Sequence, residues 1–239
     1  MPRVPLAKTA SRAPTLARLH AEIEGCRACP RLVEWREEVA REKRRMHRAC
    51  TYWGRPVPGF GDPKARILVL GLAPAAHGAN RTGRAFTGDR SGDFLFAALH
   101  RAGLANQPSS TGLDDGLALR DVFVSISLRC APPANAPRPD ELTRCAPFLD
   151  REIALLPNLR VVLALGAIAW NAYLDHLARR GVALKRPRPT FTHGAEASGS
   201  PLLLGSYHVS QQNTQTGRLT AEMFDAVVGT AQARAGLVL

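Results

Sequence analysis

Four short apolar segments, each followed by a helix-like pattern, constrain the fold of this 239-residue chain more than any other feature. They span residues 66–71, 121–128, 159–166 and 202–208, and their length and continuous apolar character predict buried strands. The helical patterns lie at residues 92–100, from 139 onward, at 167–180 and at 219–231. This alternation predicts an α/β protein of three layers (α/β/α), in which helices cover both faces of a central, mostly parallel, four-stranded sheet.

The start of the chain differs in composition from the rest. Residues 1–16 are basic and rich in Pro and Ala, and helical spacing begins near Leu16. We therefore expect a basic, flexible tail at 1–16 and a single domain at 17–239, which is long enough to bury a core without disulfides. Residues 31–48 carry mixed charges typical of a solvated helix, and residues 183–200 predict a long basic loop.

The net charge of +12 narrows the class of partner. Arginine dominates the cations, and its planar guanidinium suits phosphate, so nucleic acid is a favoured partner. The longest apolar run, 161–170, has ten residues, whereas a membrane-spanning helix needs roughly 20. Because the first residues also lack a sustained apolar stretch, we expect no signal peptide, no membrane partner and a cytoplasmic location.

A long polar loop at residues 71–89 follows the first predicted strand. It holds four glycines, two arginines, a histidine and the aromatic Phe86. Open α/β sheets bind ligands at the carboxyl ends of their strands, where this loop begins. The loop is therefore the first candidate for a substrate site.

Four of the five cysteines form two pairs along the chain. Cys26 and Cys29 have the two-residue spacing that lets two thiolates hold one metal centre. Cys130 ends the second predicted strand, and Cys145 lies on the helix that Pro139 opens. Because disulfides are rare in a reducing cytosol, this set favours a metal centre, with buried structural thiols as the alternative. Cys50 belongs to neither pair.

Four segments together resemble the type b, or fifth, family of the uracil-DNA glycosylase superfamily. They are the cysteine pair with residues 58–63, the loop 71–89, residues 129–137 with Cys145, and residues 206–218. They occur in the family's order and cover the chain from about residue 22 to residue 231. The segment 208–218, which holds a His-x-Ser motif, is the most specific of the four.

The resemblance implies an activity and a cofactor. Members of this family flip uracil, and other deaminated bases such as hypoxanthine and xanthine, out of double-stranded DNA and hydrolyse the N-glycosidic bond. The product is an abasic site. The family carries a four-iron four-sulfur (4Fe-4S) cluster, and the matching ligands here are Cys26, Cys29, Cys130 and Cys145.

The resemblance also implies roles for three site residues. His208 matches the second active-site motif, Asn135 matches the residue that holds the catalytic water, and Phe86 matches the aromatic that stacks on the flipped base. Stacking on an aromatic ring is worth about 1–3 kcal/mol per base, which offsets the few kcal/mol that extrusion costs. The substrate-binding candidates are Gly71, Ala73, His77, Asn80 and Phe86.

Two departures from related families shape the expected mechanism. Residues 71–75 carry no polar side chain, so no general base is evident there, and Asn135 can orient a water but not deprotonate it. We therefore expect a dissociative reaction, in which water captures a cation-like sugar. Ile126 stands where some relatives read uracil with an asparagine, which predicts a broad range of excised bases.

Contact with DNA is expected from side chains around the loop 71–89 and after His208. The arginines suit phosphate, and the amides suit the gap that the flipped nucleotide leaves. Binding should weaken steeply with added salt. The DNA-binding candidates are Arg81, Arg84, Gln211, Gln212, Asn213 and Arg218.

The resemblance favours a monomeric, monofunctional uracil-DNA glycosylase over other functions. The lysines lie outside the four family segments, so strand cleavage by a lyase reaction is not expected. A non-catalytic iron–sulfur DNA-binding module or redox sensor would explain the charge and the cysteines equally well. It would not explain polar groups at several strand ends. A nucleotide-binding enzyme is disfavoured because the first loop lacks phosphate-binding glycine motifs.

Overall fold

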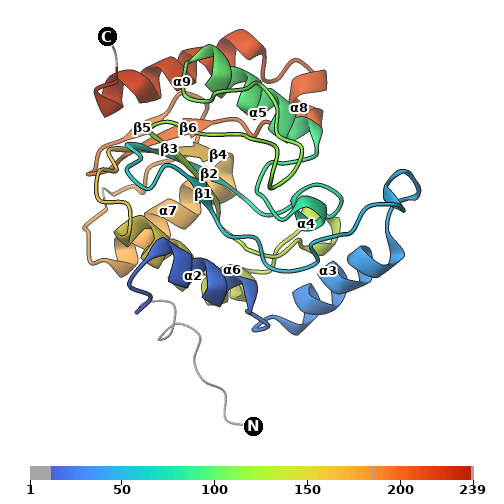
Figure 1. The fold of residues 1–239 in the computed structure, drawn as a ribbon. Coiled ribbons are helices and arrows are strands. Elements are labelled where there is room, and N and C mark those ends of the chain that lie inside the picture. The colour runs from blue at the N-terminus through green and yellow to red at the C-terminus, as the bar shows by residue number, and fades with distance from the viewer. Residues whose placement is uncertain (1–11, 185, 238–239) are drawn as a thin grey trace.

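The computed structural model describes residues 12–184 and 186–237, and a single sheet forms its centre (Figure 1). The four predicted strands are present and mutually parallel, in the spatial order β3-β2-β4-β6. Every residue of β2, β3 and β4 is buried, as the continuous apolar runs predict. The four strands are β2 (Ile67–Gly71), β3 (Val122–Ile126), β4 (Val161–Leu165) and β6 (Leu202–Ser206).

The sheet is mixed, because two short strands extend its edges. β1 (Phe60–Gly61) pairs antiparallel with β3, and β5 (Glu196–Ala197) pairs antiparallel with β6. The prediction of four strands missed both, since a two-residue strand has no periodicity and both lie in loops rich in Pro and Gly. The described sheet therefore has six strands around the predicted parallel core.

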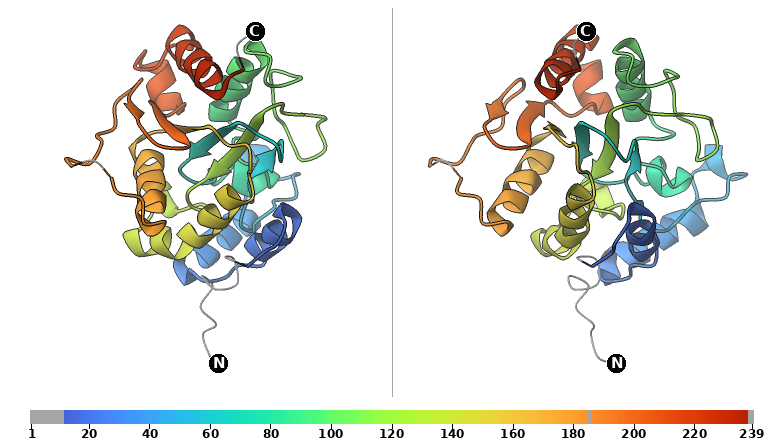
Figure 2. Two further views of the ribbon diagram at one scale, coloured as in Figure 1. Left: turned by 90° about the vertical axis from the view of Figure 1, so that its left-hand side faces the viewer. Right: turned by 60° about the vertical axis from the view of Figure 1, so that its left-hand side comes forward.

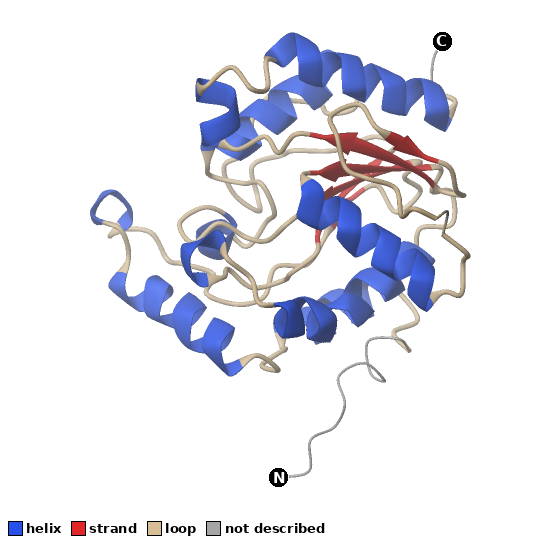
Figure 3. Ribbon diagram, turned by 180° about the vertical axis from the view of Figure 1, so that it is seen from behind, coloured by secondary structure: helices blue, strands red, loops and turns tan. Residues whose placement is uncertain are grey.

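Helices cover both faces of the sheet, which confirms the predicted three layers (Figure 3). Alternate side chains of each strand point to opposite faces. In β2, Ile67 and Val69 face one helical layer, while Leu68 and Leu70 face the other. One layer holds α5 (Arg90–Arg101) and α9 (Ala221–Ala235), and the other holds α6 (Pro139–Ala154) and α7 (Ala167–Arg179).

Within the described ranges, no helix combines the length and apolar character needed to cross a membrane.

The N-terminal segment adds two helices, α2 (Leu16–Glu24) and α3 (Pro30–Glu42), which are blue in Figure 2. Helix α2 packs against α6, and the Thr15 side chain caps its first turn. Most of the expected tail, residues 1–11, lies outside the described residues. Residues 12–16 belong to the folded part, because Ala13 is buried and its carbonyl accepts a hydrogen bond from Arg151 Nε.

The connections out of β2 and β4 diverge at the carboxyl edge of the sheet. The chain after β2 passes through α4 (Ala79–Thr82) to α5 on one face, whereas the chain after β4 passes to α7 on the other. Neighbouring strands whose connections leave in opposite directions open a crevice, where α/β proteins place their ligands. Gly71 ends β2 and Gly166 follows β4 at this point.

Candidate active site

Phe86 and His208 meet at the carboxyl edge of the sheet, although 122 residues separate them in the sequence. Their ring centroids lie 6.2 Å apart with the planes tilted by 32°. Phe86 comes from the loop after β2, and His208 from the segment after β6. Burial lowers the pKa of His208, so its imidazole is neutral at neutral pH.

Two glycines make room for this pair. A Cβ atom on Gly71 would lie 2.5 Å from Phe86 Cζ, so only glycine lets the ring approach the end of β2. At the end of β4, Gly166 adopts a φ of +94° and faces His208. A Cβ on Gly92 would lie 1.8 Å from the Phe86 carbonyl oxygen, which fixes the Phe86 backbone against the start of α5.

The backbone at Phe86 is itself unusual. Its φ is +53°, in the left-handed region that residues with a large side chain rarely adopt. Such a conformation persists only where the surroundings hold it, and it is common at functional sites. The resemblance predicted Phe86 as the stacking aromatic. The structure places it beside His208, in the same apolar cluster as Ile126.

Asp89 is a carboxylate of this loop that the sequence did not single out. It caps α5, where Oδ1 accepts a hydrogen bond from the Gly92 N–H at 3.0 Å. A Cβ on Gly78 would lie 2.2 Å from Asp89 Oδ2, so the loop folds closely around the carboxylate. Burial raises the pKa of Asp89 despite its backbone hydrogen bonds. The sequence does carry a signal for the capping role of Asp89, because an Asp directly before a helix is a typical N-cap and this one lies three residues after Phe86.

Asn135 lies on another loop at the same edge of the sheet. It ends the short helix η2 (Pro133–Asn135) after β3, and its side chain is exposed. Both Ala134 and Asn135 have positive φ, of +52° and +55°. In the described part of the chain, no hydrogen bond or ring contact joins Asn135 to Phe86 or His208.

His77 and Asn80 brace the loop. His77 Nδ1 lies 3.1 Å from the Tyr52 hydroxyl, and burial, followed by nearby arginine charges, lowers the pKa of His77. Asn80 is buried, and its Nδ2 donates to the carbonyl of Arg36 at 3.2 Å. These contacts argue against Asn80 as a direct substrate ligand. Ala73 packs on the cluster of apolar side chains around the cysteines.

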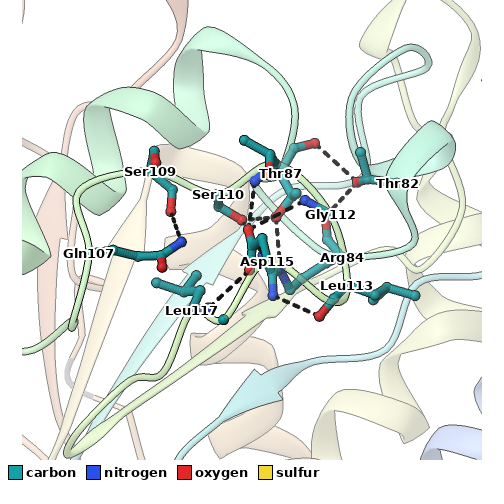
Figure 4. Close-up of polar contacts among 12 residues, drawn as sticks. Thr82, Arg84, Thr87, Gln107, Ser109, Ser110, Gly112, Leu113, Asp115 and Leu117 are labelled. Atoms are coloured by element: carbon teal, nitrogen blue, oxygen red, sulfur yellow. Dashed lines mark hydrogen bonds and ion pairs between the residues drawn. The ribbon is translucent and has the colours of Figure 1, made fainter.

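Arg84 occupies a buried polar network rather than the surface (Figure 4). Its guanidinium pairs with Asp115, donates to Ser110 Oγ at 2.7 Å and donates to Thr87 Oγ1 at 3.2 Å. Burial acts to raise the pKa of Asp115, but Arg84 and three backbone N–H donors together lower it to about 2. Because Arg84 is buried and paired with Asp115, it is not available to phosphate, and the expectation that it contacts DNA is wrong. The residue instead anchors the backbone on both sides of Phe86.

The other DNA-binding candidates divide into braced and exposed groups. Arg81 donates from Nε to the His77 carbonyl and from an Nη to the Gly88 carbonyl, so it closes the loop on itself. Asn213 on α8 (Gln211–Gln215) donates from Nδ2 to the His208 carbonyl at 2.8 Å. The exposed candidates are Gln211, Gln212 and Arg218, the last with its guanidinium 4.7 Å from the Tyr207 ring centroid.

The four paired cysteines line one small cavity, together with apolar side chains such as Leu32 and Phe148. Cys26 and Cys29 lie between α2 and α3, Cys130 follows the end of β3 by four residues, and Cys145 lies on α6. No three His, Cys, Asp or Glu side chains within residues 12–184 and 186–237 stand close enough to hold a single metal ion. Cys50 does not line this cavity.

Donors surround the sulfur atoms. The buried Arg36 guanidinium donates to Cys130 Sγ at 2.9 Å, and the backbone N–H of Arg129 donates to Cys145 Sγ at 3.3 Å. Burial raises the pKa of Cys130 to about 11 despite Arg36, so this thiol is protonated unless a metal displaces the proton. Four convergent thiols with N–H donors are a donor set that fits an iron–sulfur cluster.

Known proteins match this chain over most of its length. The family model of the uracil DNA glycosylase superfamily matches residues 58–232. A type-5 uracil-DNA glycosylase of Thermus thermophilus is 54% identical over 90% of this chain and 96% of its own. One of Mycobacterium tuberculosis is 51% identical over 95% and 85%, and one of Pyrobaculum aerophilum is 45% identical over 88% and 89%. The chain therefore belongs to the uracil DNA glycosylase superfamily, within its type-5 family.

Proposed function

We propose that this protein is a DNA repair glycosylase that flips uracil out of double-stranded DNA and hydrolyses its N-glycosidic bond, leaving an abasic site. The observation that carries the proposal is the pairing of Phe86 with His208 at the crevice between β2 and β4. The type-5 uracil-DNA glycosylases of similar sequence support the choice of substrate. In this proposal the enzyme acts as a monomer in the cytoplasm.

Base capture rests on Phe86. The flipped base stacks on the ring, and the absence of a side chain at Gly71 leaves backbone groups beside it as hydrogen-bonding partners. Stacking contributes about 1–3 kcal/mol, similar to the cost of extrusion. His77, which contacts the Tyr52 hydroxyl, braces the loop that encloses the base.

His208 stabilises the leaving group. Bond cleavage places negative charge on the base, and a neutral imidazole N–H donates to it without first taking up a proton. The low dielectric that lowers the pKa of His208 also strengthens this hydrogen bond. Asn213 holds the His208 carbonyl and so fixes the position of the ring.

Water attack follows departure of the base. Asn135 orients the water, and its exposed amide on the loop after β3 is free to do so. Asp89 supplies the carboxylate that residues 71–75 lack, and a negative charge on it favours the cation-like sugar. The reaction stays dissociative, since Asp89 is already committed to capping α5.

The range of bases is broad. Ile126 is buried on the Phe86 side of the sheet and has no polar group with which to read a uracil edge. Backbone groups therefore do most of the reading, and hypoxanthine and xanthine are accepted besides uracil. Ile126→Asn is expected to narrow this range, and an unchanged range would contradict the assignment.

The four cysteines would hold a 4Fe-4S cluster. The cluster would cross-link the segment between α2 and α3, the loop after β3 and helix α6, and its contribution would be structural. Arg36 and the Arg129 N–H would then donate to cluster-ligating sulfurs, as such donors do in other cluster sites.

His208→Ala separates this proposal from a non-catalytic DNA-binding module or redox sensor. An enzyme loses base release by at least two orders of magnitude while it still binds a duplex that carries an abasic-site analogue. The loop variant Gln107→Ala, a half-buried residue whose Nε2 donates to the Ser109 carbonyl and which is far from His208 in sequence, serves as the control. A wild-type protein that binds DNA but releases no base from uracil, hypoxanthine or xanthine duplexes would contradict the proposal.

A further inference from the structure

Residues 43–50 form a basic arm that the proposed mechanism does not use. The arm holds Lys43, Arg44, Arg45, His47 and Arg48, and no acidic residue occurs from there to Gly61. It contains the short helix η1 (Arg45–His47) and stands out beyond the end of α3 (Figures 1 and 3). Its mixed-charge sequence predicted only a solvated helix, yet α3 ends at Glu42, before the arm.

Among the residues that the structure describes, the cations of the arm have no carboxylate partner. Exposed arginines elsewhere, such as Arg101, Arg179 and Arg188, pair with aspartates. Among the ion pairs of the described residues, none involves a cation of residues 43–50. A concentration of unneutralised positive charge on a projecting segment is the electrostatic footprint of a polyanion site.

The tip of the arm carries an exposed apolar side chain. Met46 is 73% exposed, the highest exposure among the large apolar residues of the described chain. It is flanked by Arg45 and His47, with Arg44 and Arg48 beyond them. Apolar side chains set among cations are characteristic of elements that enter a DNA groove.

The arm has a defined shape. Lys43 turns the chain out of α3 with a φ of +54°, and its Nζ donates to the Arg48 carbonyl at 3.4 Å. At its base, the Arg44 N–H lies 3.4 Å from the Tyr52 hydroxyl. Hydrogen bonds therefore tie the arm down near both of its ends.

The same base connects the arm to the loop of the active site. Tyr52 contacts His77 through its hydroxyl, and the N–H groups of Trp53 and Gly54 donate to the carbonyls of Arg81 and Asn80 at 2.9 and 3.0 Å. The arm thus emerges directly from the segment that packs on α4, next to the loop that holds Phe86.

We propose that residues 43–50 bind the sugar-phosphate backbone of the duplex beside the flipped nucleotide, with Met46 laid against the edges of the groove. The inference rests on the proposed glycosylase function, which supplies DNA at the adjacent pocket. A duplex presents closely spaced phosphates along its axis, and this spacing suits several neighbouring arginines at once. The arm therefore contributes affinity independent of the excised base.

The salt dependence of DNA binding tests the proposal. The double variant Arg45→Gln/Arg48→Gln, in the full chain, is titrated by fluorescence anisotropy on a labelled duplex that carries one tetrahydrofuran abasic-site analogue. Loss of two phosphate contacts should flatten the slope of log K against log salt by about 1.8, since each contact contributes about 0.9. Affinity at low salt should fall at least tenfold.

The double variant Arg120→Gln/Arg180→Gln is the matched control. It removes the same charge from exposed positions at the amino edge of the sheet, just before β3 and just after α7. Its slope should remain within a few tenths of the wild-type slope. An arm variant that keeps the wild-type slope and affinity would overturn the proposal, and the arm's charge would then serve a different partner.

Met46→Ala tests the apolar contact separately. It should weaken binding about threefold to tenfold with an unchanged salt slope, because it removes no charge. Binding equal to wild type would contradict the groove contact. Base release by the wild-type enzyme is measured in parallel, so that a failure of the glycosylase function is distinguished from a failure of the arm.

Discussion

Asn213 donates a 2.8 Å hydrogen bond from its Nδ2 to the carbonyl oxygen of His208. Asn213 lies on α8, whose first turn Ser210 caps, so the start of that helix and the candidate catalytic histidine form one unit. The amide that the sequence offered as a filler for the gap in DNA is thus engaged in holding the active site. A residue that acts through His208 should affect the rate more than the binding of DNA.

Asn213→Ala should lower the single-turnover rate of uracil release about tenfold to a hundredfold, because small displacements of a catalytic group cost up to this much. The DNA concentration that gives half of the maximal rate should change less than threefold. Gln215→Ala, an exposed position on the same short helix, is the control. A variant that binds DNA weakly yet reacts at the wild-type rate would show that Asn213 contacts DNA instead.

Gly71→Ala should close the base pocket. The new Cβ would lie 2.5 Å from Phe86 Cζ, so the ring must move, and we expect a loss of about 1–3 kcal/mol in the free energy of unfolding. Uracil release should fall at least tenfold. Gly229→Ala, whose Cβ would meet no atom within 4 Å outside its own stretch of α9, should leave release unchanged and slightly stabilise α9. Equal effects in the two variants would contradict the role of Gly71.

The Arg84–Asp115 pair should make the protein sensitive to acid. The folded-state pKa of Asp115 is about 2, below the ordinary value of 3.8, so its contribution is full above pH 4 and is lost as the pH falls towards 2. The shift corresponds to about 2 kcal/mol. Chemical denaturation between pH 4 and pH 2 should show this loss in the free energy of unfolding of the wild type. Asp115→Asn should be less stable than the wild type at pH 7, and its free energy of unfolding should not show the same fall between pH 4 and pH 2.

The pH dependence of the rate should reveal the protonation state of His208. Because burial lowers the pKa of His208 below 6.5, the neutral form predominates at neutral pH. The single-turnover rate should therefore stay flat as the pH is lowered from 8 to 6.5. A rate that rises about tenfold per pH unit over that range would indicate catalysis by the imidazolium.

The sequence predicted the parallel core of the fold because each of its strands is a continuous apolar run. Strands β2, β3, β4 and β6 fall within the predicted segments, and Pro139 opens α6 as expected. The edge strand β5 could not be predicted, since its two residues pair with β6 only through tertiary structure. The types and order of neighbouring residues are enough to predict a buried strand. They are not enough to predict an edge strand whose pairing depends on residues elsewhere in the sheet.

The candidate site was predictable in its residues but not in their contacts. The resemblance named Phe86 and His208, and the structure brings them together. Arg84 was misassigned because its partner Asp115 lies 31 residues away, and charge alone does not distinguish a buried ion pair from a phosphate ligand. The same limit applies to Asn213, whose bond to His208 depends on how α8 begins.

The release of base from an end-labelled duplex with one uracil opposite guanine tests the central claim most directly. Incubation with the enzyme followed by alkali should break the labelled strand at the uracil, and omission of alkali should leave it intact. That result would identify a monofunctional glycosylase that leaves an abasic site. No alkali-dependent break from folded protein that binds the duplex would contradict the account.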